Sequence, residues 1–592
     1  MHWAYHHAEK LRKRGGHQVI CAGITPSGNT HVGHLREILS AEMIHRACLE
    51  GQLSSKFIII IDSMDPLHKL YNFLGPGYEK WVGHPLAYIP PPDKEAIEED
   101  PNALLEPDPT WTSERADEGG PRSSYAGYFT EEIKDILHNV GATTSWHSPF
   151  SENDHECRHP SPPRESTFHF LMNHESYAHA EYAIPRQNED GVREPYSGFI
   201  DTVISKKDEI RKIIEEISGR GLDEDWFPYN PRDSKGSMDG VKVTGYESPY
   251  VHWVDSHGVE GRSDIRKAEG KLPWRIDWAA RWILHGVTCE PSGKDHSAAG
   301  GSFDTGIPIC ELLGGNPPEK LAYEWIQIKG VGPMSSSTGV GIKPGEVLEI
   351  IPAYIIRYLI ARSKMNRHID FDTGEELLRI AEEYERAVLE PIQRAEYTKR
   401  QRIAKETQEG AIKLSQFNYG EVPPAAIWQM ETPEVVSFAY LSRVAQSLKE
   451  EEDVWAQLRK SGHLEGEPSG LLVIRLGKIR AWLDGPHFPD SLRLPEVPDM
   501  DAPDAASGLK LSDAQKEFLV CLVENLERCE WTEDGIMDSI KESSVATGLE
   551  IGEAFRTLNN KLYSRESGPN VSRFLLSIDR EAAVAVLSFT EG

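Results

Sequence analysis

A strand, a turn and the start of a helix follow one another in residues 21–34, which read CAGITPSGNTHVGH. The apolar run at 19–24 predicts a short buried strand. The Pro-Ser-Gly-Asn sequence at 26–29 then predicts a tight turn. Apolar residues recur at helical spacing over 35–44, so a helix is expected to begin directly after that turn.

Two histidines, His31 and His34, lie one helical turn apart at the expected start of this helix. A helix N-terminus offers free amides and the positive end of the dipole, which suit a phosphate. The histidines would add donors from one face, and Gly33 leaves room for a flat ring against the backbone. Taken alone, H-x-G-H fits an ordinary pair of surface histidines better, because short motifs recur by chance.

An unbroken apolar run, FIIII at 57–61, ends at Asp62. A continuous run of this kind is typical of a parallel strand that is buried on both faces. With the preceding strand and helix it makes a βαβ unit, so Asp62 and Asp65 are expected at the carboxyl edge of the sheet, where ligands bind. A solvated turn that ends the strand is the alternative.

A second segment, KGVGPMSSSTG at 329–339, lies far downstream. Together the two segments resemble the paired signatures of class I aminoacyl-tRNA synthetases. A longer set of sequence pieces, which includes them, resembles the archaeal type of class I lysyl-tRNA synthetase. The matching pieces occur in order over about residues 17–345: GITPSG at 23–28, HVGHLRE at 31–37, DSMDPL at 62–67, WRIDW at 274–278, GKDH at 293–296 and MSSS at 334–337.

The resemblance implies a lysine–tRNA ligase that activates lysine with ATP, accompanied by Mg²⁺, and transfers the lysyl group to tRNA(Lys). It assigns residues to three tasks: catalysis to His31, His34, Met334, Ser335, Ser336 and Ser337, ATP binding to Gly33, Gly293 and Asp295, and lysine binding to Gly23, Thr25, Trp274, His296 and Tyr323. We add Asp277 on chemical grounds, because a carboxylate close to Trp274 in sequence is suited to pairing the lysine ammonium.

The sequence departs from the family pattern in its second signature. Pro333 precedes Met334 and Thr338 follows Ser337, where the family usually carries lysines. Either Lys329 or Lys343 reaches into the site, or the serines and loop amides suffice. The glycines around the serines predict a mobile closing loop, and an interdomain linker is the simpler alternative.

No zinc is expected, although relatives usually carry zinc-binding cysteines. The corresponding stretches read PRDSKG at 231–236 and DSHG at 255–258, without thiolates. Seven scattered cysteines with no C-x-x-C argue against a four-cysteine site or a disulfide framework. A metal-like cluster over 154–159 lacks paired spacing, so a polar surface loop is preferred and no metal site is predicted.

Two domains are expected. Residues 1–345 are expected to form a Rossmann-like α/β catalytic domain on a parallel sheet, with insertions at about 90–120 and 151–194 and a small zinc-less β-containing region at about 225–263. From 346 to 592 helical patterns prevail, and the resemblance implies a mostly α-helical anticodon-binding domain there.

The net charge of −30, from 94 acidic and 64 basic residues, argues against a non-specific nucleic-acid binder, but a local basic groove for tRNA fits within an acidic body. No apolar run reaches the length of a membrane span, and the N-terminus lacks a signal-peptide pattern. We therefore expect a cytoplasmic protein without a membrane partner.

Two other functions fit the same signatures. A glutamyl-type class I synthetase or a nucleotidyltransferase would use the same nucleotide site, and a basic residue facing the amino-acid side chain would favour the glutamyl type. A non-catalytic paralogue that binds tRNA without charging it would explain the missing signature lysines and thiolates.

Overall fold

The chain forms two compact units in the computed structural model. Its described residues are 1–100, 103–118, 122–142, 168–178, 183–187, 193–334, 341–389, 399–415, 436–486, 488–493, 511–563, 571–578 and 580–588. The first unit comprises Met1–Glu346, Ile356–Phe371 and Ile392–Tyr419, and the second comprises Val347–Ile355, Asp372–Pro391 and Gly420–Gly592. The first unit therefore includes two segments that follow position 346 in sequence.

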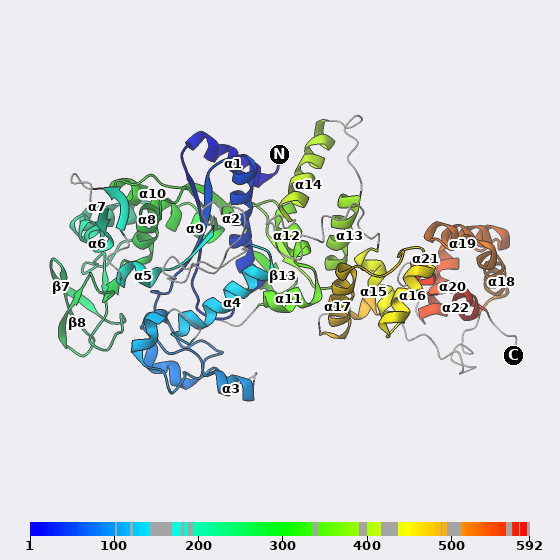
Figure 1. Cartoon of the computed structure of the whole chain (residues 1–592), viewed down its shortest axis with the longest axis horizontal. Helices are drawn as coiled ribbons and strands as arrows, with labels where there is room; N and C mark the ends of the chain where they lie inside the picture. Colours follow the sequence, from blue (N-terminus) through cyan, green and yellow to red (C-terminus); the bar gives the residue numbers. More distant parts are fainter. Residues whose placement is uncertain are drawn as a thin grey trace. The chain divides into compact units, whose positions relative to one another are not determined.

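A five-stranded parallel sheet is the centre of the first unit (Figure 1). Its strands are β1 (Gln18–Ile24), β2 (Ser55–Ile61), β3 (Phe168–Met172), β11 (Cys289–Gly293) and β12 (Glu319–Tyr323). Their spatial order is β12-β11-β1-β2-β3, and every pairing is parallel. This is the order of a Rossmann-like sheet, so the predicted fold class is confirmed.

Helices cover both faces of the sheet, which explains why β2 is apolar at successive positions. Val19 and Ile58 belong to one buried cluster with α8 (Trp274–His285) and α10 (Ser302–Leu312). Alternate residues such as Ile59 face the other side, where α2 (Val32–Glu50) crosses β1, β2 and β11. Figure 1 shows α2 and α8 on opposite sides of the sheet.

Strand β3 lies within the stretch at 151–194 that we expected to be an insertion. Residues 57–61 of β2 pair in parallel with 168–172, so part of this stretch belongs to the central sheet. The expected metal-like cluster over 154–159, and the rest of 143–167, lies outside the described residues. The stretch at 90–120 contains α3 (Lys94–Glu99) and a short 3₁₀ helix at Ser113–Glu118.

A small antiparallel sheet fills the region at about 225–263. It consists of β7 (Lys242–Glu247), β8 (Tyr250–Val254) and β9 (Glu260–Asp264). Packing and hydrogen bonds hold it: the buried Trp253 donates from Nε1 to Ser263 Oγ at 2.9 Å, and the Ser263 hydroxyl donates to the Arg232 carbonyl at 3.0 Å. Within the described ranges, no group of three or more His, Cys, Asp and Glu side chains is suited to a metal ion.

Buried arginines fix α2 against α12 (Ala353–Arg362). Arg36 donates to the carbonyls of Ile360 and Lys364, at 3.1 and 3.0 Å. Arg357 pairs with Glu42 at 2.7 Å, and neither side chain is exposed. These contacts hold the helix that begins at the signature histidines, so its N-terminus has a fixed position over the sheet.

The second unit is helical over most of its described residues. Its helices include α13 (Glu375–Leu389), α15 (Phe438–Ser447), α16 (Glu451–Lys460), α17 (Gly470–Asp484), α18 (Asp513–Arg528), α19 (Glu533–Thr547), α20 (Ile551–Tyr563), α21 (Val571–Ser577) and α22 (Arg580–Leu587). The predicted helical character of the C-terminal part is thus confirmed. None of the helices in the described parts of the chain is both long and apolar enough to cross a membrane.

Candidate functional site

A cavity with two adjoining lobes opens at the carboxyl ends of β1 and β11, where the strand order reverses. This switch point is where parallel α/β sheets bind ligands. The first lobe has a volume of about 350 Å³ and the second about 630 Å³. Six residues line both lobes: Gly23, Ile24, His34, Glu37, Asp295 and His296.

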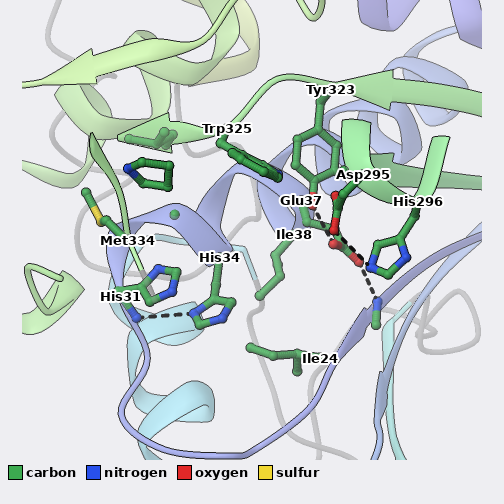
Figure 2. Close-up of a pocket in the computed structure, with 15 residues that line it drawn as sticks. Ile24, His31, His34, Glu37, Ile38, Asp295, His296, Tyr323, Trp325 and Met334 are labelled. Atoms are coloured by element: carbon green, nitrogen blue, oxygen red, sulfur yellow. Dashed lines mark hydrogen bonds and ion pairs between the residues drawn. The ribbon is translucent and has the colours of Figure 1, made fainter. Parts of the chain in front are cut away.

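The first lobe brings together both signatures. Besides the shared residues it is lined by His31, Gly33, Ile38, Gly293, Tyr323, Trp325, Ile326, Pro333 and Met334. Gly33 and Met334, which are about 300 positions apart in the sequence, therefore face one cleft (Figure 2). The predicted residues Ser335, Ser336 and Ser337 lie outside the described residues.

The two signature imidazoles stack on each other. Their ring centroids are 3.8 Å apart with an interplanar angle of 16°. The His31 backbone N–H donates to Nδ1 of His34 at 3.2 Å, as the dashed line in Figure 2 shows. Because Nδ1 accepts this bond, the proton of a neutral His34 ring is on Nε2.

Both imidazoles are neutral at physiological pH. Burial lowers the pKa of His31 to about 4. Burial, with a smaller contribution from His31, lowers the pKa of His34 to about 3. Each ring therefore carries one N–H donor and no charge, so it can bind an anionic oxygen as a hydrogen-bond donor only.

The start of α2 has fewer free amides than the sequence led us to expect. The Val32 N–H donates to the Ile342 carbonyl at 3.0 Å, and the His34 N–H donates to the His31 carbonyl at 3.0 Å. The His31 amide is taken by the His34 ring. A phosphate at this terminus would thus rely on the imidazole donors and the helix dipole rather than on these three amides.

Gly33 is required by the His31 ring. A Cβ at position 33 would lie 2.7 Å from Nδ1 of His31, closer than atoms approach without a shift. The flat ring that packs on Gly33 therefore includes the neighbouring imidazole itself. Gly341, just after the serines, is equally close, since a Cβ there would lie 2.8 Å from Cβ of His31.

Glu37 lies at the junction of the two lobes and was not among the predicted site residues. Its carboxylate accepts the Gly23 N–H at 2.9 Å and the Tyr323 hydroxyl at 2.6 Å (Figure 2). Burial raises its pKa to about 7, although both hydrogen bonds act in the opposite direction. The signal in the sequence was its place in HVGHLRE, one helical turn after His34.

Aromatic rings form one wall of the second lobe. Trp274 and Trp278, one turn apart on α8, stack with centroids 5.0 Å apart, and the His296 ring lies 5.9 Å from Trp274. Thr25, which follows β1, donates from its hydroxyl to Asp65 Oδ2 at 3.0 Å. The predicted residues Trp274, Thr25 and His296 are thus brought together at this lobe.

Asp277 lines neither lobe and is fully buried. It accepts hydrogen bonds from the hydroxyls of Tyr177 and Tyr196, and Arg281 Nε lies 3.7 Å from its carboxylate. Groups within the protein therefore already neutralise Asp277. Our expectation that it pairs a substrate ammonium is corrected: the carboxylates available to a ligand are others.

Gly293 is the last residue of β11, and Asp295 lies two residues later at the start of the short helix α9 (Lys294–Ser297), beside Gly293. A Cβ at Gly293 would lie 2.5 Å from Asp295 Oδ1 and 3.3 Å from Trp325 Nε1. The absence of a side chain at 293 thus leaves room for both groups at the rim of the first lobe. Trp325 and Tyr323 both line this lobe, and in the view of Figure 2 they lie above the histidines.

The lining of the cavity is acidic. Its carboxylates are Glu37, Asp62, Asp65, Glu290 and Asp295, whereas no lysine or arginine is among the described residues that line either lobe. Arg281 and Lys271, behind the lining, pair with Asp62 and Asp65. The carboxylates Glu37, Glu290 and Asp295 have no lysine or arginine partner among the described residues, and they favour a cationic ligand over an anionic side chain.

Comparisons with known proteins agree over most of the chain. A family model described as tRNA synthetases class I (K) matches residues 1–100 and 174–444. The lysine–tRNA ligase of Picrophilus torridus is 30% identical over 584 residues, covering 98% of this chain and 97% of that protein. The lysine–tRNA ligase of Thermoplasma acidophilum is 31% identical over 577 residues, covering 96% of each. The chain therefore belongs to the class I (K) family of tRNA synthetases.

Proposed function

We propose that the protein is a lysine–tRNA ligase. In the first step the lysine carboxylate attacks the α-phosphate of ATP, forming lysyl-adenylate and releasing pyrophosphate. In the second step a hydroxyl of the terminal ribose of tRNA(Lys) attacks the lysyl carbonyl, and AMP leaves. The family membership and the near full-length similarity to lysine–tRNA ligases support this activity.

The carboxylates of the cavity lining that have no lysine or arginine partner among the described residues are the observation that carries the choice of lysine. Lysine brings an ammonium that requires acceptors, and a four-carbon stem that requires apolar walls such as Trp274 and Trp278. A glutamate substrate would require a cation opposite its carboxylate, and none is among the described residues that line the lobes. This difference favours the lysyl over the glutamyl activity.

We assign ATP to the first lobe. His31 and His34 would donate to phosphate oxygens, Gly33 keeps the two rings stacked, and Gly293 and Asp295 would lie beside the nucleotide. Phosphoryl chemistry of this kind requires positioning and charge stabilisation more than a protein nucleophile. Neutral imidazole donors meet that requirement without a change of protonation during the reaction.

We assign lysine to the second lobe and the junction. Gly23, Thr25, Trp274 and His296 line this part of the cavity, and Tyr323, which lines the first lobe, contacts the junction through its hydrogen bond to Glu37. Glu37 positions two of them, because it accepts from the Gly23 amide and the Tyr323 hydroxyl. Lysine bound there would present its carboxylate toward the first lobe, where the α-phosphate would lie.

Mg²⁺ would enter with ATP. The described residues offer no cluster of side chains that would hold the ion by themselves. Phosphate oxygens of ATP and water would therefore be its main ligands. Its chemistry there is the neutralisation of phosphate charge.

Exchange of labelled pyrophosphate into ATP, measured with each of the amino acids in turn, tests the proposal. Lysine-dependent exchange, followed by charging of tRNA(Lys), is the expected result. Exchange with glutamate would support the glutamyl-type alternative. No exchange with any amino acid, together with retained tRNA binding, would support the non-catalytic paralogue, for which the absence of lysines at Pro333 and Thr338 is the argument.

A further inference from the structure

The carboxylates of the second lobe differ in whether a cation of the protein already neutralises them. Arg281 Nη1 lies 2.5 Å from Asp62 Oδ1, and Lys271 Nζ lies 2.5 Å from Asp65 Oδ1. Although burial opposes ionisation, the Lys271 charge lowers the pKa of Asp65 below its usual value. These two carboxylates are therefore occupied before any substrate arrives.

Three carboxylates of this lobe have no lysine or arginine partner among the described residues: Glu37, Asp295 and Glu290. Both oxygens of Glu37 accept hydrogen bonds, from the Gly23 amide and the Tyr323 hydroxyl, and Asp295 is exposed beside His296.

Glu290 differs from both. It lies on β11, is 4% exposed, and has no ion-pair partner among the residues that the structure describes. Arg281 is near enough to act on its charge, but the contacts of Arg281 within 4 Å are with Asp62 and Asp277. Glu290 is thus a buried carboxylate of the cavity lining that lacks a paired cation, which is costly unless a ligand supplies one.

The orientation of Glu290 is fixed. Its Oε2 accepts the Trp282 indole N–H at 2.6 Å, which holds the carboxylate in one rotamer. Its Oε1 lies 3.8 Å from the point where a Cβ on Gly23 would be. Because position 23 is a glycine that lines both lobes, the space in front of this oxygen is left to the cavity.

We infer that Glu290 is the residue that selects a substrate side chain ending in a primary ammonium, by pairing with that ammonium at the floor of the second lobe. This inference rests on the proposed function, and it replaces Asp277 in the role that we first expected. The apolar stem of the substrate would lie along Trp274 and Trp278, which line the same lobe. The bound ammonium then neutralises the carboxylate that the protein leaves unpaired.

The variant Glu290→Gln tests the inference, because glutamine keeps the shape and an acceptor for Trp282 but removes the charge. Pyrophosphate exchange is measured with lysine and with the lysine analogue in which a hydroxyl replaces the ammonium. We expect kcat/KM for lysine to fall by about 100-fold or more, while kcat/KM for the hydroxyl analogue changes by less than about threefold. Equal losses for both substrates, or no loss for lysine, would overturn the inference.

A second variant, Glu290→Asp, keeps the charge and retracts it by one methylene. We expect this variant to lose activity with lysine and to gain relative activity with homolysine, whose longer side chain restores the distance. An unchanged ratio of lysine to homolysine would also count against Glu290. Impaired folding would lower the activity with both substrates equally, so it would not raise the activity with homolysine relative to lysine.

Glu319→Gln is the matched control. Glu319 begins β12, the strand beside β11, lines neither lobe, and pairs with Lys10 at the surface. We expect the ratio of kcat/KM for lysine to kcat/KM for the hydroxyl analogue to be the same in Glu319→Gln as in the unmodified protein. If the unmodified protein itself shows no lysine-dependent exchange, the proposed function fails. If the unmodified protein shows lysine-dependent exchange, and Glu290→Gln leaves the ratio of the two kcat/KM values unchanged, only the inference about Glu290 fails.

Discussion

The backbone amide of His31 donates to Nδ1 of His34 across 3.2 Å, and this bond fixes which nitrogen of His34 faces the cavity with a proton. Replacing His34 by Asn retains an acceptor for that amide but removes the distal N–H donor. We expect adenylate formation to slow by about 100- to 1,000-fold with an unchanged melting temperature, as for loss of one donor to a reacting phosphate. Single-turnover pyrophosphate release measures the rate. An unchanged rate would contradict the phosphate role of the histidine pair.

The pH dependence of lysine use follows Glu37 rather than the histidines. The pKa of Glu37 is raised to about 7 by burial, so the carboxyl is protonated below neutral pH and ionises as the pH rises. Lysine carries its ammonium throughout this range, so we expect kcat/KM for lysine to rise with a midpoint near pH 7 and to level off above about pH 8. Glu37→Gln should remove this inflection. Since the pKa values of His31 and His34 lie at about 4 and 3, neither should produce a step above pH 5.

Gly33→Ala should distort the site without changing any charge. The added Cβ would lie 2.7 Å from Nδ1 of His31, so the stacked ring must shift. We expect about 1–3 kcal/mol of destabilisation, and a KM for ATP raised about tenfold or more. Gly345→Ala is the control, because a Cβ there meets nothing within 4 Å. A normal KM for ATP in Gly33→Ala would show that the stacked pair is not needed for nucleotide binding.

A lysine at position 333 should accelerate the first step. Pro333 lines the first lobe, and the family's second signature usually has a cation at this place. We expect Pro333→Lys to raise kcat for pyrophosphate exchange by up to about 100-fold, the converse of removing one stabilising group from a transition state. The same change should leave the KM for lysine unaltered. A slower enzyme would mean that other groups already fill this position when the substrates are bound.

The buried pair between Arg357 and Glu42 should contribute strongly to stability. Arg357 also donates to the carbonyls of Leu414 and Val140, at 2.9 and 3.2 Å, so its loss leaves several buried acceptors unpaired. We expect Arg357→Met to lower the free energy of unfolding by about 3–5 kcal/mol. The exposed pair Lys212–Glu216 provides the control, and Lys212→Met should cost less than about 0.5 kcal/mol. Denaturant titration of both variants measures the difference.

The centre of the fold could be predicted because its pattern is local. The apolar runs before Thr25 and before Asp62, with the turn between them, specify two parallel strands and the intervening helix. Strand β3 was not predicted, because its five residues, FHFLM, form a short apolar run within a stretch rich in His, Glu, Asn and Pro, and its place beside β2 shows only in the parallel pairing.

The site shows the same contrast. The described signature residues His31, Gly33, His34 and Met334 line one lobe, although the first motif follows a strand of the five-stranded sheet and the second follows strands of a separate three-stranded sheet. Asp277 differs from its neighbours for a helical reason: Trp274 and Trp278 share one face of α8 and line the cavity, whereas Asp277 faces Arg281 on another. Glu290 could not be identified from the sequence, because a single carboxylate in a short strand has no distinctive pattern. It stands out only when the structure shows that no lysine or arginine among the described residues pairs with it.

The reversal of strand order has a consequence for synthesis on the ribosome. Strand β1 is complete at Ile24, but its neighbour on one side, β11, begins only at Cys289. Until that later strand emerges, one row of backbone donors and acceptors on β1 has no neighbour and is open to wrong pairing with other chains. The interval from Ile24 to Cys289 is close to half of the chain, so this edge of β1 is completed late in synthesis.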